Sequence, residues 1–260
     1  MKTAIVTGGT KKDVDAMAVL ALNLQDVSPN LADELIIFHD GISADKQKLI
    51  QKIMPTRFIR YKCPISWFQL MCNRTIRYFS PMVFCKYECF RLLEKFDRVI
   101  WTDYDVVITK GIDELKGRKA KLSVVADHST VLRKMFYPTI EKKKMEGYDL
   151  EGVSITTPIF VLNRSLGHYT EYCDWCYAMT RKYIKYIYLP EQCIITMLVQ
   201  NFKIKYEELD METYYYHPRN ATEKTKILHA YGQPKYWNGL HNEQWESYYN
   251  NWKSMKGSMQ

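Results

Sequence analysis

Residues 97–108 constrain this chain more than any other stretch, because they place two acids directly after an apolar run. The run at 99–101 is bounded by charged or polar residues, which predicts a short buried strand. Asp103 and Asp105 follow it with one residue between them. Open α/β sheets bind ligands beyond the carboxyl ends of their strands, so both carboxylates are expected there. Paired carboxylates suit Mg²⁺ or Mn²⁺, although two solvated acids in a loop also explain the triplet.

A second motif, at residues 229–235, has chemistry that complements the first. It reads His-Ala-Tyr-Gly-Gln-Pro-Lys and follows a short apolar stretch. His229 offers a nitrogen ligand, and Gly232 lets the backbone turn close to a phosphate. Lys235 offers a compact positive charge to that phosphate. Together the two motifs predict a metal–diphosphate site of the kind that binds a nucleotide sugar.

The pair of motifs resembles family 8 glycosyltransferases, the family of glycogenin and of the bacterial lipooligosaccharide galactosyltransferases. That family combines Asp-x-Asp with a later His-x-x-Gly-x-x-Lys, and the resemblance covers most of residues 2–237. It implies a GT-A fold, which is an α/β fold with a single mixed, mostly parallel sheet and helices on both faces. It also implies that Asp103, Asp105 and His229 hold Mn²⁺ or Mg²⁺.

The activity that this resemblance implies is retaining transfer of a hexose. The donor would be UDP-glucose or UDP-galactose, and the acceptor a hydroxyl of a saccharide or glycolipid in cell-surface glycan synthesis. The resemblance places a larger set of residues at the donor, namely Thr7, Gly8, Lys86, Asp103, Tyr104, Thr156, Gly232 and Lys235. Thr156 replaces the family's asparagine, and a hydroxyl has one donor where an amide has two, so donor choice is the property most affected.

Three residues are expected near the reacting carbon. Glu191 and Gln192 match an Asp-Gln pair of the family, and Asp127 follows a predicted strand at 121–126. Gln192 is a poor nucleophile, so front-face attack assisted by the departing phosphate is favoured over a double displacement. Simpler explanations remain open, because a helix N-terminus favours an acid such as Glu191. Likewise, a turn with Ser129 explains Asp127.

The order of the remaining elements fits a nucleotide-binding fold. A strand at 2–7, a glycine turn and a helix at 13–25 form the opening βα unit. Further strands are expected at 35–38, 57–61 and 157–162, and further helices at 43–54, 81–95, 165–187 and from 190 onward. Residues 62–80 have no clear period. The long stretch 128–154 is interpreted as a flap over the acceptor side.

Charge and composition restrict the partners. The formal net charge of +8 favours an anionic partner such as a nucleotide sugar or an anionic membrane surface. The sequence contains no basic block interleaved with aromatics, which is the pattern that would indicate nucleic-acid binding. The lysine run at 142–144 is interpreted as a solvated face. Residues 238–260 are rich in Trp, Tyr and Lys, and follow a predicted domain at 1–237. This tail suits either a membrane interface or a helix packed on the domain.

Seven cysteines cannot all pair within one chain, and residues 1–9 show no signal-peptide pattern. We therefore expect reduced thiols and a protein that is cytoplasmic, either free or peripheral on the inner face of the membrane. Cys85, Cys89, Cys173 and Cys176 have spacings that zinc sites also use. Small buried helix residues are the favoured explanation of these four.

Two other functions fit parts of the sequence. A non-catalytic relative that binds a nucleotide sugar is consistent with the change at 156–158. An inverting GT-A transferase or a sugar nucleotidyltransferase is the second alternative, and Asp127 would then act as a general base near the acceptor. The intact residues Asp103, Asp105, His229 and Lys235 argue against the non-catalytic relative.

Overall fold

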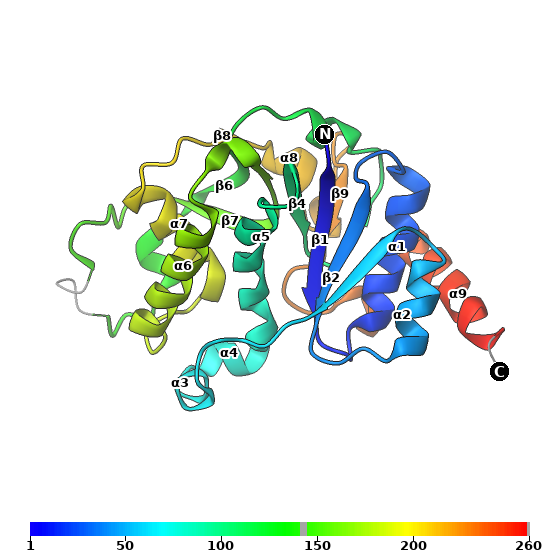
Figure 1. The fold of residues 1–260 in the computed structure, drawn as a ribbon, viewed down its shortest axis with the longest axis horizontal. Helices are drawn as coiled ribbons and strands as arrows, with labels where there is room; N and C mark the ends of the chain where they lie inside the picture. The colour runs from blue at the N-terminus through cyan, green and yellow to red at the C-terminus, as the bar shows by residue number, and fades with distance from the viewer. Residues whose placement is uncertain (141–144, 259–260) are drawn as a thin grey trace.

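The central sheet has seven strands in the order β3-β2-β1-β4-β7-β6-β8 (Figure 1). This computed structural model describes residues 1–140 and 145–258. The strands are β1 Thr3–Gly9, β2 Glu34–His39, β3 Thr56–Arg60, β4 Arg98–Thr102, β6 Leu122–Val131, β7 Val153–Asn163 and β8 Glu207–Glu208. The first four are parallel to one another, whereas β7 runs antiparallel to both β4 and β6. The predicted mixed, mostly parallel sheet of a GT-A fold is therefore confirmed.

A two-stranded sheet stands beside the central one, in addition to the single sheet that the sequence predicts. It pairs β5 (Val106–Ile108) with β9 (Ile227–His229) in antiparallel register. Val106 lies opposite His229 in this ladder. The pairing therefore brings the end of the Asp-x-Asp segment next to the start of the second motif.

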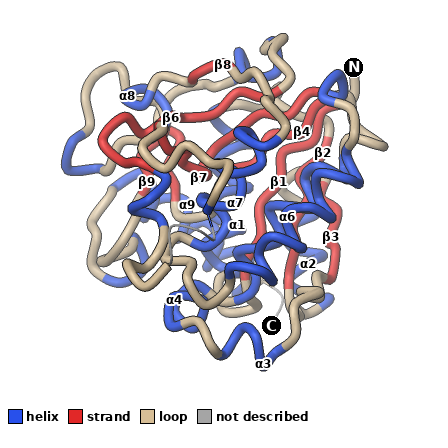
Figure 2. Tube along the Cα trace, turned by 90° about the vertical axis from the view of Figure 1, so that its left-hand side faces the viewer, coloured by secondary structure: helices blue, strands red, loops and turns tan. Residues whose placement is uncertain are grey.

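Helices cover both faces of the central sheet (Figures 1 and 2). One face carries α1 (Val14–Val27), α2 (Ala44–Gln51) and α9 (Glu243–Gly257). The other carries the 3₁₀ helix Pro81–Tyr87 and the helices α5 Glu88–Leu92, α6 Tyr169–Tyr183 and α7 Pro190–Asn201. Because side chains alternate along each strand, they pack into two cores, one on each face of the sheet. In β1, Ala4 and Val6 face the second group of helices, whereas Ile5 faces the first.

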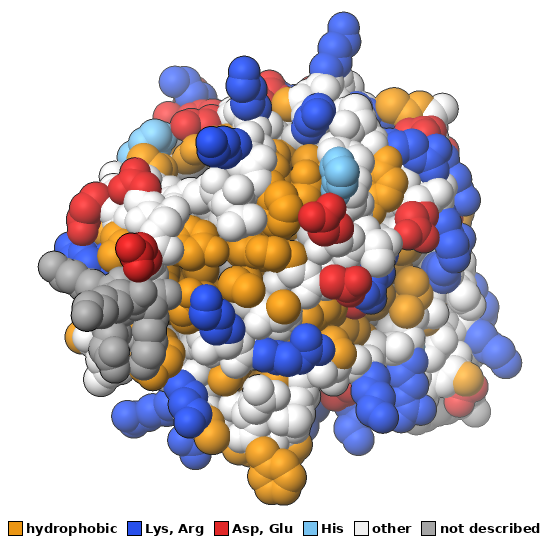
Figure 3. Space-filling view, turned by 60° about the vertical axis from the view of Figure 1, so that its left-hand side comes forward, with side chains coloured by type: hydrophobic (Ala, Val, Ile, Leu, Met, Phe, Trp, Pro, Cys, Tyr) orange, Lys and Arg blue, Asp and Glu red, His pale blue; other side chains and the backbone are white. Residues whose placement is uncertain are grey.

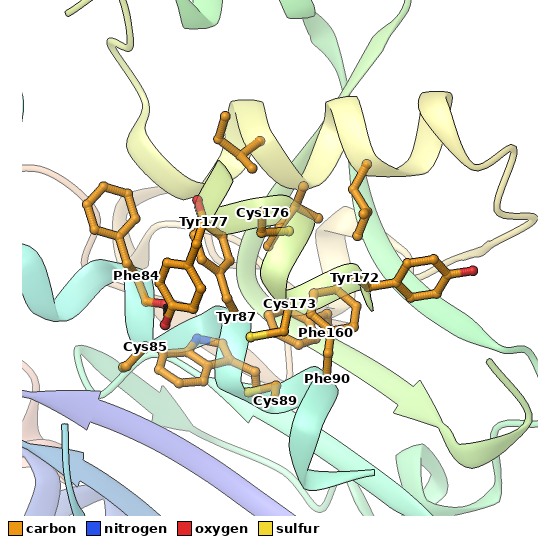
Figure 4. Packing of buried hydrophobic residues seen from close by; sticks show 14 of the residues in the cluster. Phe84, Cys85, Tyr87, Cys89, Phe90, Phe160, Tyr172, Cys173, Cys176 and Tyr177 are labelled. Atoms are coloured by element: carbon orange, nitrogen blue, oxygen red, sulfur yellow. Dashed lines mark hydrogen bonds between the residues drawn. The ribbon is translucent and has the colours of Figure 1, made fainter. Parts of the chain in front are cut away.

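Four of the seven cysteines lie in the core between α5, α6 and the 3₁₀ helix (Figure 4). They are fully buried among aromatic rings, and burial raises the pKa of each thiol; they are Cys85, Cys89, Cys173 and Cys176. Within the described residues they form no group with metal-ligand spacing, so the structure does not support the zinc alternative. They pack as the small buried helix residues that the sequence favours.

Several boundaries differ from the predicted ones. The expected helix at 165–187 begins later, as α6, because Gly167 takes a positive φ of 66° just before it, and it ends at Tyr183. Residues 62–80 contain two short helices, α3 (Trp67–Met71) and α4 (Arg74–Phe79). Ser66 and Asn73 cap them by accepting backbone N–H donors. Helices of one or two turns are too short for a hydrophobic period to reveal them.

The predicted flap at 128–154 begins as regular structure. β6 continues to Val131, so residues 128–131 belong to the sheet, and a 3₁₀ helix follows at Leu132–Met135. The strand expected at 157–162 likewise starts earlier, at Val153. The lysine run at 142–144 lies outside the described residues.

The aromatic tail forms α9, which packs against α1. Trp252 is fully buried, and its indole Nε1 donates to Asp15 Oδ1 at 2.8 Å. Lys256 pairs with the same carboxylate at 3.0 Å. A short helix, α8 (Met211–Tyr214), precedes β9 on the way to this segment. Among the described residues, no helix has the length and apolar character needed to cross a bilayer. The domain boundary at residue 237 stays a prediction.

Candidate active site

The two acids of the Asp-x-Asp segment are fixed by backbone contacts at the carboxyl end of β4. The amide of Asp103 donates to the Pro158 carbonyl of β7 at 2.8 Å. The carbonyl of Asp105 accepts from the Ala230 amide at 2.9 Å. These bonds tie the segment to the central sheet on one side and to the end of β9 on the other. The predicted position beyond a strand's carboxyl end is thus observed.

Asp103, Asp105 and His229 come together as a potential metal site. His229 Nε2 lies 3.1 Å from Asp105 Oδ1 and 3.7 Å from Asp103 Oδ2. One ligand atom from each residue lies within 4.8 Å of the others, and no other such group occurs in the described part of the chain. Two carboxylates and one imidazole at this spacing fit a divalent cation such as Mn²⁺ or Mg²⁺.

Asp103 uses its two oxygens differently. Oδ1 accepts from the Trp101 indole at 2.8 Å and lies 3.0 Å from Lys86 Nζ. Oδ2 faces His229. One oxygen is therefore held by the protein, and the other is left to point at the metal site. A metal bound here would therefore meet Asp103 through one oxygen.

Lys235 lies against the same site in the structure. Its ammonium pairs with Asp105 Oδ2 and donates to the Ala230 carbonyl at 2.6 Å. Burial alone would raise the pKa of Asp105, but His229 and Lys235 together hold it well below its usual range. Gly232 has a positive φ of 74°, which favours glycine and turns the chain back toward Asp105.

A second cluster adjoins the first through Lys86, which is almost fully buried. Lys86 Nζ lies 2.7 Å from Glu191 Oε1 and donates to the Thr157 carbonyl at 3.1 Å. The Thr157 hydroxyl donates to the same Glu191 oxygen at 2.8 Å. Burial would lower the pKa of Lys86, but Asp103 and Glu191 raise it above its usual value. Lys86 is thus a charged bridge between two acids.

Thr157 is a site residue that the sequence analysis missed. The donor contact was expected from Thr156, whose hydroxyl instead donates to the Val125 carbonyl of β6 at 3.2 Å. The ladder pairs Val125 with Thr156 and Val124 with Phe160, so residues 157–159 form a bulge with no partner on β6. A bulge re-aims side chains, and here it carries Thr157 to Lys86 and Glu191.

Three of the predicted donor residues pack against other parts of the protein. Thr7 is buried in β1. A Cβ on Gly8 would lie 2.4 Å from Cys85 Sγ, so the glycine lets β1 and the 3₁₀ helix that carries Lys86 approach closely. The Tyr104 ring stacks on Trp237 with centroids 5.9 Å apart. Their contact with a donor stays a prediction.

The residues predicted at the reacting carbon are Asp127, Glu191 and Gln192, and Glu191 is linked to Asp103 through Lys86. Asp127 accepts from the backbone amide and hydroxyl of Ser129 at 2.9 and 2.6 Å. Burial would raise the pKa of Asp127, but these bonds lower it. The turn with Ser129 is therefore present. Gln192 is partly exposed at the start of α7, beside the buried Glu191. Roles for all three in the reaction remain predictions.

A group of aromatic side chains next to His229 also escaped the sequence analysis. Tyr215 stacks on Tyr231 with centroids 5.4 Å apart, and both rings contact the His229 imidazole. His217 meets the Tyr231 ring from another side. Tyr231 keeps 42% of its surface exposed. The three consecutive tyrosines at 214–216 were the one indication of this group in the sequence. The sequence alone does not show that their segment pairs with β9.

Comparison with known proteins assigns the family. The model of glycosyl transferase family 8 matches residues 4–241, and no curated protein sequence matches the chain. The chain belongs to glycosyltransferase family 8, and its fold and metal-ligand geometry agree with that assignment.

Solved structures show the same fold. An active-site mutant of LgtC aligns with a TM-score of 0.72 and 14% identity, over 98% of this chain and 95% of that one. The galactosyltransferase LgtC in complex with donor and acceptor sugar analogs aligns with a TM-score of 0.69 and 14% identity, over the same shares. GlyE of Streptococcus pneumoniae TIGR4 has a TM-score of 0.63 and 15% identity, over 98% and 64%.

Proposed function

We propose that this glycosyltransferase moves a hexose from UDP-glucose or UDP-galactose to a hydroxyl of a saccharide or glycolipid acceptor, with retention at the anomeric carbon. The observation that carries the proposal is the convergence of Asp103, Asp105 and His229, whose ligand atoms lie within 4.8 Å of one another. A ligand set with one imidazole favours Mn²⁺ at least as much as Mg²⁺. The galactosyltransferase LgtC, solved with donor and acceptor sugar analogs, supports the substrate classes.

The charges around the ligand set suit a departing nucleoside diphosphate. A divalent ion bound there would neutralise negative charge on the two phosphates. Lys235, which pairs with Asp105 in the structure, would then turn to the distal phosphate. Lys86 pairs with both Asp103 and Glu191, and so it fixes the positions of the two carboxylates beside the donor site. We infer that the lysine charges act mainly on the leaving group.

The bond changes follow from retention without a protein nucleophile. The bond between the anomeric carbon and the phosphate oxygen breaks, and an acceptor oxygen bonds to the same face. The acceptor's proton passes to the departing phosphate. Gln192, the residue expected beside the anomeric carbon, is an amide and does not supply a nucleophilic carboxylate.

The inverting alternative required Asp127 as a general base. Hydrogen bonds from Ser129 occupy this carboxylate and lower its pKa, which makes it a weaker base. We therefore keep the retaining transferase as the single proposal. A cytoplasmic location and a role in cell-surface glycan synthesis remain part of it, as expected from the sequence.

Release of UDP from UDP-glucose and UDP-galactose, with Mn²⁺, with Mg²⁺ and with excess EDTA, tests the proposal. We expect turnover with a divalent ion and none with EDTA. Asp105→Asn and His229→Ala should abolish it, whereas His241→Ala, which changes an exposed histidine paired with Glu246, should not. Undiminished turnover in EDTA would contradict the metal site.

A thermal-shift measurement separates binding from transfer. Mn²⁺ with UDP should raise the melting temperature of the wild type and of His241→Ala, but not of His229→Ala. A shift in the wild type without UDP release from any donor would establish the non-catalytic relative instead.

A further inference from the structure

Exposed aromatic side chains gather at one end of the molecule, on and around α3 and α4. The structure has nine large hydrophobic residues that are exposed among those it describes, and five of them lie here. Trp67 is 64% and Phe68 is 84% exposed at the start of α3. We define the aromatic–basic surface by Trp67, Phe68, Tyr78, Phe79 and Tyr188 together with Arg74, Arg77, Arg181, Lys182 and Lys185.

The charge of this surface has one sign. Residues 46–87 contain no Asp or Glu, and neither do residues 175–190. Arg74, Arg77, Lys182 and Lys185 are exposed and form no ion pair with any residue that the structure describes. Figure 3 shows hydrophobic atoms protruding at the lower end of the molecule, with Lys and Arg side chains on either side. That end is where α3 lies in Figure 1.

The aromatic residues and the basic residues of this surface adjoin each other. Phe68, Arg181, Lys182 and Lys185 line one hollow of about 590 Å³, and no acid lines it. Scattered single hydrophobic residues are normal on a protein surface, whereas a contiguous group with unpaired cations points to a partner. The hollow gives room for a phosphate-bearing headgroup between Phe68 and the cationic side chains that line it.

The exposed aromatic residues lie on a segment, α3 and α4, that hydrogen bonds hold in place. Asn73, between α3 and α4, is buried, and its side-chain amide donates to the carbonyls of Ile184 and Ile187 at 2.5 and 2.7 Å. Its side-chain oxygen accepts from the amides of Thr75 and Ile76 at 2.8 and 3.0 Å. Arg181 donates to the Pro64 carbonyl at 3.2 Å. Because these bonds fix α3 and α4 against the end of α6, the aromatics are presented outward by the fold.

We propose that the aromatic–basic surface docks the protein on an anionic lipid bilayer. Rings of Trp and Tyr settle at the level of the headgroups, and lysine and arginine are attracted to anionic lipids. The aromatic end is a protrusion in Figure 1, which suits insertion into a flat interface. Single-stranded nucleic acid is instead bound along grooves that follow its backbone. The surface is distinct from the tail at 238–260, whose Trp245 and Trp252 are buried.

This surface also adjoins the active site. Gln233, in the loop that carries Lys235, donates to the Tyr78 hydroxyl at 3.4 Å. Docking would therefore bring that loop close to the bilayer, within reach of an acceptor carried by a lipid. This consequence rests on the proposed function, whereas the docking itself does not.

Sedimentation of the full chain with vesicles tests the docking without any donor. The vesicles are phosphatidylcholine alone, or phosphatidylcholine with about one third phosphatidylglycerol, which supplies the negative surface potential. We expect binding to the anionic vesicles and much less to the neutral ones. Equal partitioning to both, or no binding to either, would overturn the proposal whatever the result of the UDP assay.

Paired variants locate the surface. Lys182→Gln with Lys185→Gln should weaken binding about fivefold for each lysine removed. Trp67→Ser with Phe68→Ser should weaken it as well, with an unchanged melting temperature because both side chains are exposed. Lys119→Gln with Lys121→Gln removes the same charge from exposed positions before β6 and should bind as the wild type does. An equal loss in this control would show that only net charge matters, and the docking surface would be rejected.

Discussion

The ammonium of Lys86 lies 2.7 Å from Glu191 and 3.0 Å from Asp103, so one buried cation joins the two acidic parts of the active site. Asp103 follows β4, and Glu191 opens α7. The two elements are distant in sequence, and Thr157 of β7 completes the contact. Lys86 therefore positions the two acidic side chains as well as compensating their charge.

Lys86→Met should destabilise the protein. It leaves Glu191 buried without its cation, and breaking a buried pair in this way costs about 3–5 kcal/mol. Urea unfolding measures the loss. The double variant Lys86→Met with Glu191→Gln should recover part of the stability, because the buried side chain of residue 191 is then neutral. If Lys86→Met unfolds at the same urea concentration as the wild type, the bridge contributes nothing.

Lys235→Ala should lower kcat by about 10²–10³ with a smaller change in donor KM, because negative charge on the distal phosphate grows as the glycosidic bond breaks. Lys235→Arg should recover only part of the rate, since a planar fork does not reproduce a compact ammonium. A kcat within about twofold of the wild type for Lys235→Ala would place the lysine outside the reaction.

The same variant should bind Mn²⁺ more tightly when no nucleotide is present. Lys235 pairs with Asp105 in the structure, so a cation must compete with the ammonium for that carboxylate. Removing the lysine frees the oxygen and makes the site more negative. Titration of the metal-free protein with Mn²⁺ measures the effect, and Lys256→Ala is a control outside the site. Weaker binding in Lys235→Ala would show that the lysine helps to assemble the ligand set.

Trp252→Ala should lower the free energy of unfolding by about 3–5 kcal/mol, as expected for a large aromatic removed from a core. Trp252 is fully buried, and its indole bonds to Asp15 of α1. Thermal or urea unfolding measures the change. Trp237→Ala, which removes a side chain that is 41% exposed, should cost much less stability. A tail that could be altered at Trp252 without loss of stability would not be part of the fold.

Asp15 should make the attachment of α9 sensitive to acid. Burial would raise its pKa, but hydrogen bonds from Trp252 and Lys256 lower it below the ordinary value of 3.8. A lowered pKa contributes stability above the ordinary value, and that contribution is lost as the pH falls through the folded-state pKa. The difference in unfolding free energy between the wild type and Asp15→Asn should therefore be constant near neutral pH and shrink below pH 3.8. A difference that grows in acid would contradict this assignment.

The sequence was sufficient to predict what depends on short-range pattern. The apolar run at 99–101 and the acids after it became β4 and its carboxyl-end loop, and His229 met them as the motif implied. Thr157 was missed because its direction is set by a bulge in β7 opposite β6, and a bulge depends on the pairing of two strands. Strict alternation along the strand would not have indicated it.

The aromatic–basic surface could not have been predicted either. Residues 62–80 show no helical period, because α3 and α4 are too short to display one. The exposure of Trp67 and Phe68 depends on the anchoring of Asn73 to Ile184 and Ile187, across more than a hundred residues. For the tail, composition left a membrane interface and a packed helix both open, because composition does not separate a buried tryptophan from an exposed one.

The pairing of Val106 with His229 in the β5–β9 ladder has a consequence for how the protein is made. Asp105 and His229 stand 124 residues apart in the chain. A ribosome therefore completes the whole parallel half of the sheet long before the nitrogen ligand and Lys235 emerge. Unfinished chains would hold Asp103 and Asp105 without the imidazole and the ammonium that pair with Asp105 in the complete fold.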